Sequence, residues 1–401
     1  MNKKFKLSFI LSSVIFIVSC IMSCEKLIPV TPEDDSLLDG TVEGLTYEQT
    51  AKFLRGDAAV NEVFTAATGL GPVFVSNSCI SCHAGDGKGH LTTILTRFGQ
   101  NDETGNKYLH LGGPQLQNKS IAGFMPEQLP VGVASAKFTA PAFTGLGFLQ
   151  NVSDEDIIKL TDPNDANNDG ISGVASWLGI PSTIKPSPNA IIKNGKYLHR
   201  FGKKASAYDL LHQTVNAYNQ DMGITSDFDL IDVYSQLKTD AEISTQKIND
   251  VVAYLTTLKA PIQRNQNDAD VLKGKAIFNQ LNCGGCHTTV LKTGNSPISA
   301  ISNKEFHPYT DLLLHDMGKD LDDGYTEGTA KTSEWKTPAL WGLGLSKDSQ
   351  GGRYFLMHDG RAKSIDEAIT LHGGEAQKSK TKYIELNSTE KQQLLKFLES
   401  L

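Results

Sequence analysis

Two short motifs in this chain have the spacing of a covalent cofactor site. Each reads Cys-x-x-Cys-His, and together they comprise Cys79, Cys82 and His83 and, further along, Cys283, Cys286 and His287. In such a motif each thiol can add to one vinyl group of a haem, while the histidine supplies a proximal ligand to the iron. The spacing therefore predicts two covalently bound c-type haems.

Two other uses of the same residue types fit less well. A zinc site would need the two cysteine pairs close in sequence, or further Cys and His residues at finger spacing. A thioredoxin-like dithiol would not need a histidine directly after both pairs. Haem attachment is favoured over both alternatives.

The composition limits the class of protein around these motifs. The 401 residues include 38 Lys and Arg against 45 Asp and Glu, a formal net charge of -7, with 39% hydrophobic residues. This is ordinary globular material for two or three domains. An acidic balance without a basic block argues against nucleic-acid binding, and six cysteines are too few for a disulfide scaffold.

The amino terminus has the layout of an export signal. Three lysines precede an apolar run over residues 7–22, which is typical of a secretory signal peptide. Small residues precede Cys20 and Cys24, so the segment resembles a bacterial lipoprotein signal in which a lipidated cysteine, Cys24 or else Cys20, becomes the first mature residue. A plain cleaved signal without lipid is the alternative. We expect an exported protein, periplasmic or tethered by lipid to the outer membrane of a bacterium.

A second pattern repeats after each cysteine motif. Residues 140–149 and 337–346 share five of ten aligned positions, including Pro-Ala and Gly-Leu-Gly. An acidic segment with helical spacing then follows in both halves. This repetition predicts a tandem pair of cytochrome c-like domains.

The elements that must position these motifs are predicted to be helices. Apolar residues recur at helical spacing around residues 205–222 and 245–258, and convincing alternating strands are absent. We therefore expect a mainly α fold with long irregular loops and an inserted helical segment. The expected segments are a signal peptide 1–23, a tether 24–45, an N-terminal haem domain 46–180, a linker and helical segment 181–262, and a C-terminal haem domain 263–401.

Beyond the two cysteine motifs, several short segments together carry a family resemblance. They include Asp86-Gly87-Lys88-Gly89, Gly113-Pro114-Gln115-Leu116-Gln117, Asp169-Gly170-Ile171-Ser172-Gly173, Arg200-Phe201-Gly202, Asp221-Met222-Gly223, Leu314-His315-Asp316-Met317-Gly318, Glu334-Trp335-Lys336-Thr337-Pro338, His358-Asp359-Gly360-Arg361 and His372-Gly373-Gly374-Glu375. From about residue 56 onward the chain resembles the bacterial di-haem oxidoreductase, putative peroxidase family. This family lies within the group of di-haem cytochrome c peroxidases and MauG-type enzymes.

The resemblance implies an oxidoreductase with two unequal haems. In the peroxidases the amino-terminal haem reacts with hydrogen peroxide, and the carboxy-terminal haem accepts electrons from a donor protein of small cytochrome or cupredoxin type. His83 and His287 would be the proximal ligands. A di-haem electron carrier without its own chemistry, or a structural or sensory haem lipoprotein, are the alternatives.

The resemblance also suggests a sixth ligand for the second haem. The peroxidases place a methionine fourteen positions after the histidine of their His-Asp-Gly motif, and that position here is His372. His372 would make this haem bis-histidine and lower its potential relative to Met/His ligation. Met317 is a competing ligand, and a surface or capping role for His372 is the remaining alternative.

The distal side of the first haem is less defined. A peroxide-reactive iron needs an acid or base beside the bound peroxide, and the first half has no equivalent of His372. Gln115 and Glu155 are the preferred catalytic candidates, the latter because it occupies roughly the place of a catalytic glutamate in the peroxidases. His90 and His110 are further candidates.

Two more features have a functional and a structural interpretation. Asp165, Asn167 and Asp169 alternate before a glycine as in the first half of a calcium-binding EF-hand loop, but Ser176 stands where the closing glutamate belongs. The related peroxidases hold calcium between their haem domains, whereas an Asx-rich turn needs no metal. Trp177, Trp335 and Trp341 could relay electrons between the haems or simply pack in the core.

Overall fold

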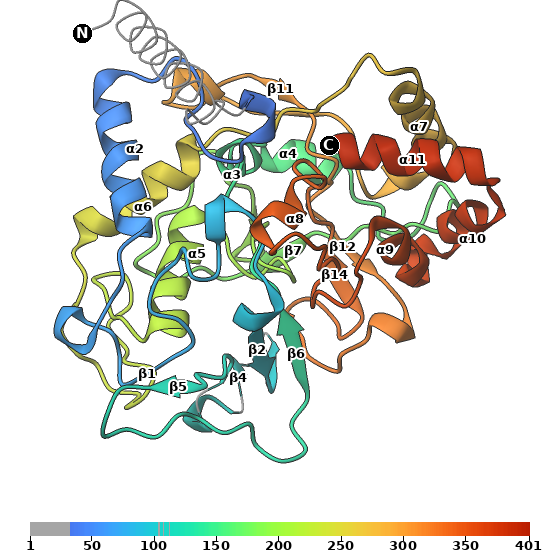
Figure 1. The fold of residues 1–401 in the computed structure, drawn as a ribbon. Helices are drawn as coiled ribbons and strands as arrows, with labels where there is room; N and C mark the ends of the chain where they lie inside the picture. The colour runs from blue at the N-terminus through green and yellow to red at the C-terminus, as the bar shows by residue number, and fades with distance from the viewer. Residues whose placement is uncertain (1–32, 103–104, 107, 112) are drawn as a thin grey trace, which may run out of the picture. The chain divides into compact units, whose positions relative to one another are not determined.

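The computed structural model describes residues 33–102, 105–106, 108–111 and 113–401. Two compact units divide the chain, Met1–Leu37 and Leu38–Leu401. The described part of the first unit contains a short 3-10 helix, Asp34–Ser36. Cys20 and Cys24, the predicted signal peptide and the start of the tether lie outside the described residues. The second unit carries all the other residues discussed below (Figure 1).

The helices are short, and most begin at a side-chain cap. Thr46 and Asn387 each form a capping box at the start of a helix, which satisfies backbone N–H groups that have no partner within the helix. The α-helices are α2 (Tyr47–Val60), α3 (Leu146–Gln150), α4 (Asp154–Lys159), α5 (Leu210–Asn216), α6 (Thr245–Thr257), α7 (Ala269–Gln280), α8 (Ser346–Ser349), α9 (Ile365–Leu371), α10 (Gln377–Glu385) and α11 (Ser388–Ser400). The π-helical turn Ala217–Asp221 continues α5.

Short strands lie between the helical parts. They are β1 (Val73–Phe74), β2 (Leu95–Phe98), β3 (Gln100–Asp102), β4 (Gly105–Asn106), β5 (Lys119–Ser120), β6 (Ser135–Phe138), β7 (Ser176–Leu178), β8 (Ile192–Lys193), β9 (Lys196–His199), β10 (Leu291–Lys292), β11 (Glu305–Phe306), β12 (Leu314–Asp316), β13 (Thr326–Gly328) and β14 (Glu334–Lys336). Most pairs are antiparallel, including β2 with β6 and β12 with β14. The parallel pair β3 and β13 joins the two halves of the chain.

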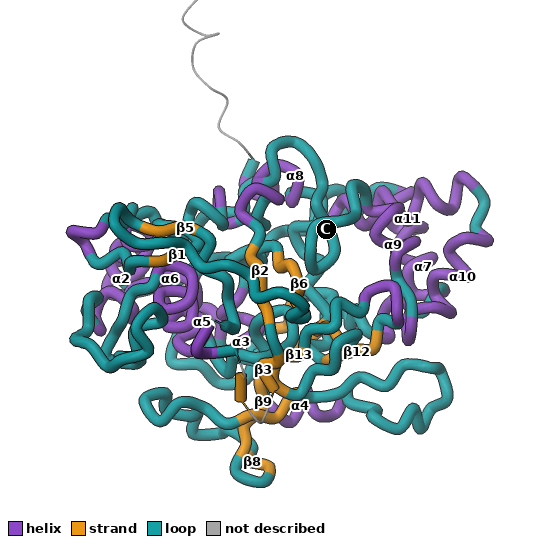
Figure 2. Tube along the Cα trace, turned by 90° about the horizontal axis from the view of Figure 1, so that it is seen from below, coloured by secondary structure: helices purple, strands orange, loops and turns teal. Residues whose placement is uncertain are grey.

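Figure 2 shows the helices in two groups, α2, α3, α5 and α6 on one side and α7, α9, α10 and α11 on the other. Strands β2, β3, β6, β9 and β13 lie between these groups. The described fold is therefore a mixture of α and β structure, and the expectation of a mainly α fold is wrong. The strands are only two to four residues long, so none is long enough to show the alternation by which a strand is recognised in a sequence.

The same helix pairing occurs in both halves. Gly56 on α2 faces α6 so closely that an added Cβ would lie 2.1 Å from the Asp250 carbonyl oxygen. Gly274 on α7 faces α11 in the same way, with 2.0 Å to the Gln393 carbonyl oxygen. Only glycine allows backbones to approach to this distance. The helix α6, within the predicted linker segment 181–262, thus packs against the first half.

The repeated Gly-Leu-Gly segments contact these pairs in equivalent places. A Cβ on Gly147 would lie 1.9 Å from the Thr256 carbonyl oxygen at the end of α6, and one on Gly344 would lie 1.9 Å from the Glu399 carbonyl oxygen near the end of α11. The repetition seen in the sequence thus has a counterpart in three dimensions. Each half has a helix, a Cys-x-x-Cys-His turn, a Gly-Leu-Gly segment and a closing helix.

Two apolar cores surround these pairs. The larger core combines Phe53 and Tyr254 of the first pair with residues of the second half such as Phe306 and Trp341. The other core is built around Phe278 and Phe397 of the α7 and α11 pair. Across the described residues, no helix has the length and apolar character needed to cross a membrane.

The glycine contacts give the first testable prediction. Gly274→Ala should destabilise the haem-loaded protein by about 1–3 kcal/mol, because the new methyl group must push α7 away from α11. Urea denaturation followed by circular dichroism measures the loss. Lys275→Ala, at an exposed position of the same helix, should change stability by less than about 0.5 kcal/mol. Equal midpoints for the two variants would contradict the close-packing argument.

Candidate haem sites

The first cysteine motif forms a turn before a short 3-10 helix, Ala84–Asp86. The Nδ1 atom of His83 lies 2.7 Å from the Pro141 carbonyl oxygen, and the Phe143 ring stacks on the imidazole with 3.9 Å between centroids. Burial lowers the pKa of His83 to about 4, so the ring is neutral at pH 7. An imidazole that donates Nδ1–H to a carbonyl keeps Nε2 for a metal ion.

The second motif repeats this arrangement with a different partner. Cys283 begins the 3-10 helix Cys283–Gly285, and Nδ1 of His287 lies 3.0 Å from the Tyr309 carbonyl oxygen. Burial lowers the pKa of His287 to about 4. His287 is therefore also a neutral imidazole with Nε2 available.

A second histidine lies close to His287. His372 follows the last residue of α9, and its Nδ1 lies 2.6 Å from the Ala368 carbonyl oxygen. Burial lowers the pKa of His372. A positive charge on His372 would in turn lower the pKa of His287, which places the two imidazoles in electrostatic range. The two residues expected as proximal and sixth ligands thus interact electrostatically, and ligation of the second haem by His372 stays a prediction.

The donor set of both sites fits a covalently attached haem. The thiols of Cys79, Cys82, Cys283 and Cys286 are free rather than paired in disulfides. Burial raises the pKa of Cys79 and of Cys283 to about 12, so these thiols stay protonated at neutral pH. No group of three or more Cys, His, Asp or Glu suited to hold a bare metal ion occurs in the described part of the chain.

Met317, the competing sixth ligand, lies next to the turn that follows His372, since a Cβ on Gly373 would be 2.9 Å from the Met317 carbonyl oxygen. Its side chain packs against the apolar cluster that contains Phe138, Leu321 and Trp335. Its backbone N–H donates to Ser333. These contacts are those of a packing residue, and ligation by Met317 stays an alternative.

Gln115 belongs to a buried polar network beside the first motif. Its side-chain amide donates to Asp221, and Arg97 donates to the Gln115 side-chain oxygen. The backbone carbonyl of Asp221 accepts from Val75 and Ser76, just before the cysteines. Burial raises the pKa of Asp221 to about 6, and its charge contributes to the raised pKa of Cys79. Asp221 belongs to the motif Asp221-Met222-Gly223, but its position in the sequence does not indicate a role for its carboxylate.

The other distal candidates lie apart from this network. Glu155 is exposed on the first turn of α4, whereas its buried neighbour Asp154 pairs with Arg200. His110 is exposed. His90 caps the 3-10 helix Leu91–Thr93 and packs edge-on against Phe355. The structure does not bring these three residues together with Gln115.

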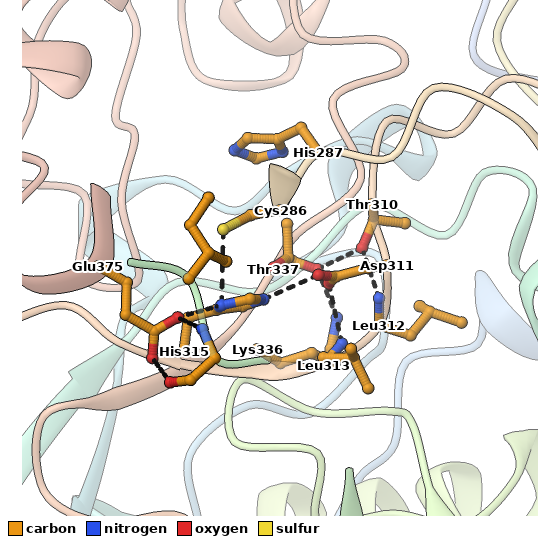
Figure 3. A network of polar contacts seen from close by, with 12 residues as sticks. Cys286, His287, Thr310, Asp311, Leu312, Leu313, His315, Lys336, Thr337 and Glu375 are labelled. Atoms are coloured by element: carbon orange, nitrogen blue, oxygen red, sulfur yellow. Dashed lines mark hydrogen bonds and ion pairs between the residues drawn. The ribbon is translucent and has the colours of Figure 1, made fainter. Parts of the chain in front are cut away.

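A buried histidine between two carboxylates adjoins the second motif (Figure 3). His315 on β12 is 2% exposed, and it donates from Nε2 to Asp311 at 2.8 Å and from Nδ1 to Glu375 at 2.6 Å. Cys286 Sγ lies 3.5 Å from the same Nδ1. Glu375 also accepts from the backbone and hydroxyl of Ser172, so this cluster joins the two halves beside the Cys286 thiol.

These contacts fix the charge states of the cluster. Burial alone would lower the pKa of His315, but its hydrogen bonds to Asp311, Cys286 and Glu375 raise it far above the ordinary value. Burial would raise the pKa of Glu375, but His315 and two backbone N–H groups lower it to about 2. The sequence motif contained His315, yet nothing in its spacing indicated two carboxylates 4 and 60 residues away.

The predicted calcium loop uses its oxygens for its own backbone. Asp165 accepts from the Gly170 N–H, Asn167 from the Asp169 N–H, and Asp169 from the Ile171 N–H. Such contacts are those of an Asx-rich turn. Calcium binding at this loop stays a prediction.

The tryptophans occupy different surroundings. Trp335 is buried between the Lys204 ammonium, 3.8 Å from the ring centroid, and the His358 ring at 3.6 Å. Trp341 is part of the larger core, with Trp177 packed at its edge. The contacts of all three are those of packing residues, and a relay role stays a prediction.

The comparisons with known proteins agree with this donor set. The family model described as "Di-haem oxidoreductase, putative peroxidase" matches residues 131–401, about two thirds of the chain, and the chain belongs to this family. The matched region contains the second cysteine motif, and the first lies before it.

The curated proteins and the solved structures do not extend this assignment. Curated proteins gave no match. Among solved structures, hydrazine synthase of Kuenenia stuttgartiensis, pressurised with xenon, is 12% identical over 94% of this chain and 98% of its own, with a TM-score of 0.36. That score is too low to carry an inference.

The His315 cluster gives a pH-dependent prediction. His315→Gln should destabilise the protein by about 3 kcal/mol, because a buried charged network loses its central partner. The contribution of His315 is complete below its ordinary pKa of 6.5 and declines as pH rises. That of Glu375 is complete above 4.5 and declines as pH falls. Urea midpoints should therefore differ most between pH 4.5 and 6.5.

The exposed His307 provides the control for this measurement. His307→Gln should leave the urea midpoint nearly unchanged across the same pH range. A His315→Gln effect that is as large at pH 9 as at pH 5.5 would refute the charged state assigned to the cluster.

Proposed function

We propose that this chain is an exported di-haem c-type cytochrome oxidoreductase with peroxidase-like activity. The amino-terminal haem, attached at Cys79 and Cys82, is the reactive one. The carboxy-terminal haem, attached at Cys283 and Cys286, transfers electrons. Membership of the di-haem oxidoreductase family supports the general class.

The observation that carries this proposal is the inequality of the two sites. Beside His287 lies a second neutral histidine, His372, whose Nδ1 is also engaged by a backbone carbonyl. Among the described contacts of His83 there is no such histidine. The first motif instead adjoins the buried network of Gln115, Asp221 and Arg97. A saturated site suits electron transfer, whereas an open site beside an acid suits reaction with peroxide.

The residues of the first site have definable tasks. A haem bound there would supply one-electron redox chemistry. Asp221, with its pKa raised to about 6 by burial, can hold or release a proton at Oδ near neutral pH. Gln115 orients that carboxyl group by donating to it, and Arg97 fixes the Gln115 side chain. Arg97 is itself held by an ion pair with Glu327 at 2.6 Å.

A di-haem electron carrier without catalytic activity is the second candidate. The neutral, carbonyl-bound imidazoles at both motifs suit a carrier equally well. The carrier would require a protein ligand on both faces of the first iron. The acidic network beside that site favours the enzyme.

The setting of the protein is part of the proposal. The lysine-led apolar segment at the amino terminus supports export, with lipidation at Cys24 or Cys20 as the tether. A small cytochrome or cupredoxin would then donate or accept electrons at the second haem, and hydrogen peroxide would react at the first. Calcium bound by Asp165, Asn167 and Asp169 would have a structural role in this loop.

The ligand assignment gives a spectroscopic prediction. His372→Ala should convert the second haem from low-spin to high-spin, because the iron loses its second imidazole. Electron paramagnetic resonance of the resting protein measures the spin state of each iron. His307→Ala, an exposed histidine in the same half, should leave the spectrum unchanged. An unaltered low-spin signal in His372→Ala would refute the assignment.

Peroxide kinetics test the activity itself. Stopped-flow mixing of the half-reduced protein with hydrogen peroxide should perturb the spectrum of the first haem. Asp221→Asn should slow this reaction by about 100-fold with unchanged haem content, because proton transfer by a positioned acid contributes about 10²–10⁴-fold.

The other outcomes separate the candidates. A spectrally silent first haem with rapid electron exchange to a partner cytochrome would establish the carrier function. Slowing by Glu155→Gln, with Asp221→Asn unaffected, would return the proton-transfer role to Glu155.

A further inference from the structure

Three lysines lie near the two Cys-x-x-Cys-His motifs, and among the described residues none of them has a carboxylate partner. Lys88 follows the first motif, Lys203 follows strand β9, and Lys336 ends strand β14. All three side chains are partly buried. Amines in this position are unusual, because a desolvated ammonium group is costly unless an anion accompanies it.

A continuous series of contacts holds the three lysines together. The N–H of Gly89, next to Lys88, donates to the Ala140 carbonyl oxygen at 3.0 Å. The adjacent Thr139 accepts from Lys203 Nζ at 3.3 Å. The Lys336 N–H in turn donates to the Lys203 carbonyl oxygen at 2.9 Å. The lysines are thus neighbours in a fixed framework.

The described residues near these amines leave their charge unbalanced. Lys336 Nζ contacts only the Thr337 carbonyl oxygen, at 3.4 Å, and no described carboxylate lies within ion-pair distance of any of the three. The carboxylates whose charges act on Lys203 and Lys336 are already engaged, since Asp359 pairs with Arg361 at 2.7 Å and Asp311 with His315 at 2.8 Å. The cluster therefore has an excess of positive charge.

The pKa values of the three amines are all lowered, as expected for lysines without a neighbouring anion. Burial, together with the charges of Lys88 and Lys336, lowers the pKa of Lys203 to about 7. Burial lowers the pKa of Lys88 and of Lys336 to about 8. Lys204 differs from these three because its ammonium is held by three backbone carbonyls.

The cluster adjoins both haem sites. Residues 139–141 accept hydrogen bonds from Lys203 at Thr139, from Gly89 at Ala140 and from His83 at Pro141. A charge on Lys203 also acts on the His83 imidazole. Lys336 lies on the strand beside His315 and appears with Cys286 and His287 in Figure 3. The lysines are therefore connected to both motifs through short stretches of chain.

We propose that Lys88, Lys203 and Lys336 bind the propionate carboxylates of the two haems. Lys88 and Lys203 bind the propionates of the first haem, and Lys336 binds a propionate of the second. This inference rests on the proposed function, since it requires haem at both motifs. The lysines then neutralise buried carboxylates, raise the reduction potentials, and hold the propionate edges of both haems in one cationic layer between the halves.

Potentiometric titration of the haem-loaded full chain tests the proposal. Lys203→Gln should lower the potential of the first haem, because an unneutralised propionate favours the oxidised iron. We expect the Fe(III)/Fe(II) ratio at a fixed ambient potential to rise about tenfold, which is ~59 mV for a one-electron couple. Lys336→Gln should do the same for the second haem. Lys137→Gln removes an exposed lysine of strand β6 and should change neither.

Haem content, measured first by pyridine haemochrome, keeps the outcomes distinct. A wild-type chain without haem overturns the proposed function and this inference together. Loaded variants with unaltered potentials overturn the lysine assignment alone. A potential of the wild-type protein that shifts saturably with added inorganic phosphate, and not in Lys203→Gln, would also overturn it in favour of a free-anion site.

A measurement on the wild type covers the case in which the variants do not fold. Resonance Raman spectra in H₂O and D₂O should show a shift of the propionate bending bands, because the carboxylates accept from exchangeable N–H groups. Unshifted bands would overturn the proposal.

Discussion

The hydrogen bond from Nδ1 of each motif histidine to a backbone carbonyl is the constraint on which both sites depend. It selects the tautomer that leaves Nε2 for iron, and it fixes the plane of the ring. The acceptors, Pro141 and Tyr309, lie 58 and 22 residues after their histidines. Each cysteine turn is therefore positioned by chain that is distant in sequence, and the helix pairs that hold this chain in place become part of the site.

Those helix pairs show what the sequence could and could not indicate. Attachment residues and the Gly-Leu-Gly repeat are local patterns, so they predict two related halves. The partner of α2, however, is α6, nearly 200 residues later, and the contact depends on Gly56 lying against the backbone at Asp250. One glycine in an amphipathic helix carries no signal of its partner. The segment that reads as an interdomain linker therefore contains the helix that closes the first half.

The candidate site residues also differ in whether local sequence or distant contacts determine their properties. His372 could be named as a candidate ligand by counting from a motif, because the count spans only a short stretch of local chain. Asp221 and His315 could not be assigned roles, since their properties arise from burial and from partners such as Gln115, Asp311 and Glu375. Glu155 has the right residue type near the expected position, but its side chain faces solvent, whereas the adjacent Asp154 is buried against Arg200. A shift of one residue on a helix decides which carboxylate enters the interior.

Polar and charged contacts join the halves in addition to the apolar core that they share. Arg97 of the first half pairs with Glu327 of the second, Ser172 donates to Glu375, and Thr139 donates to the His358 carbonyl oxygen. Buried charges interact strongly because little water screens them. A change of charge at one iron would therefore act on the groups that connect it to the other half. The apolar core and these polar contacts together join the halves, and the polar contacts would couple the electrostatics of one site to those of the other.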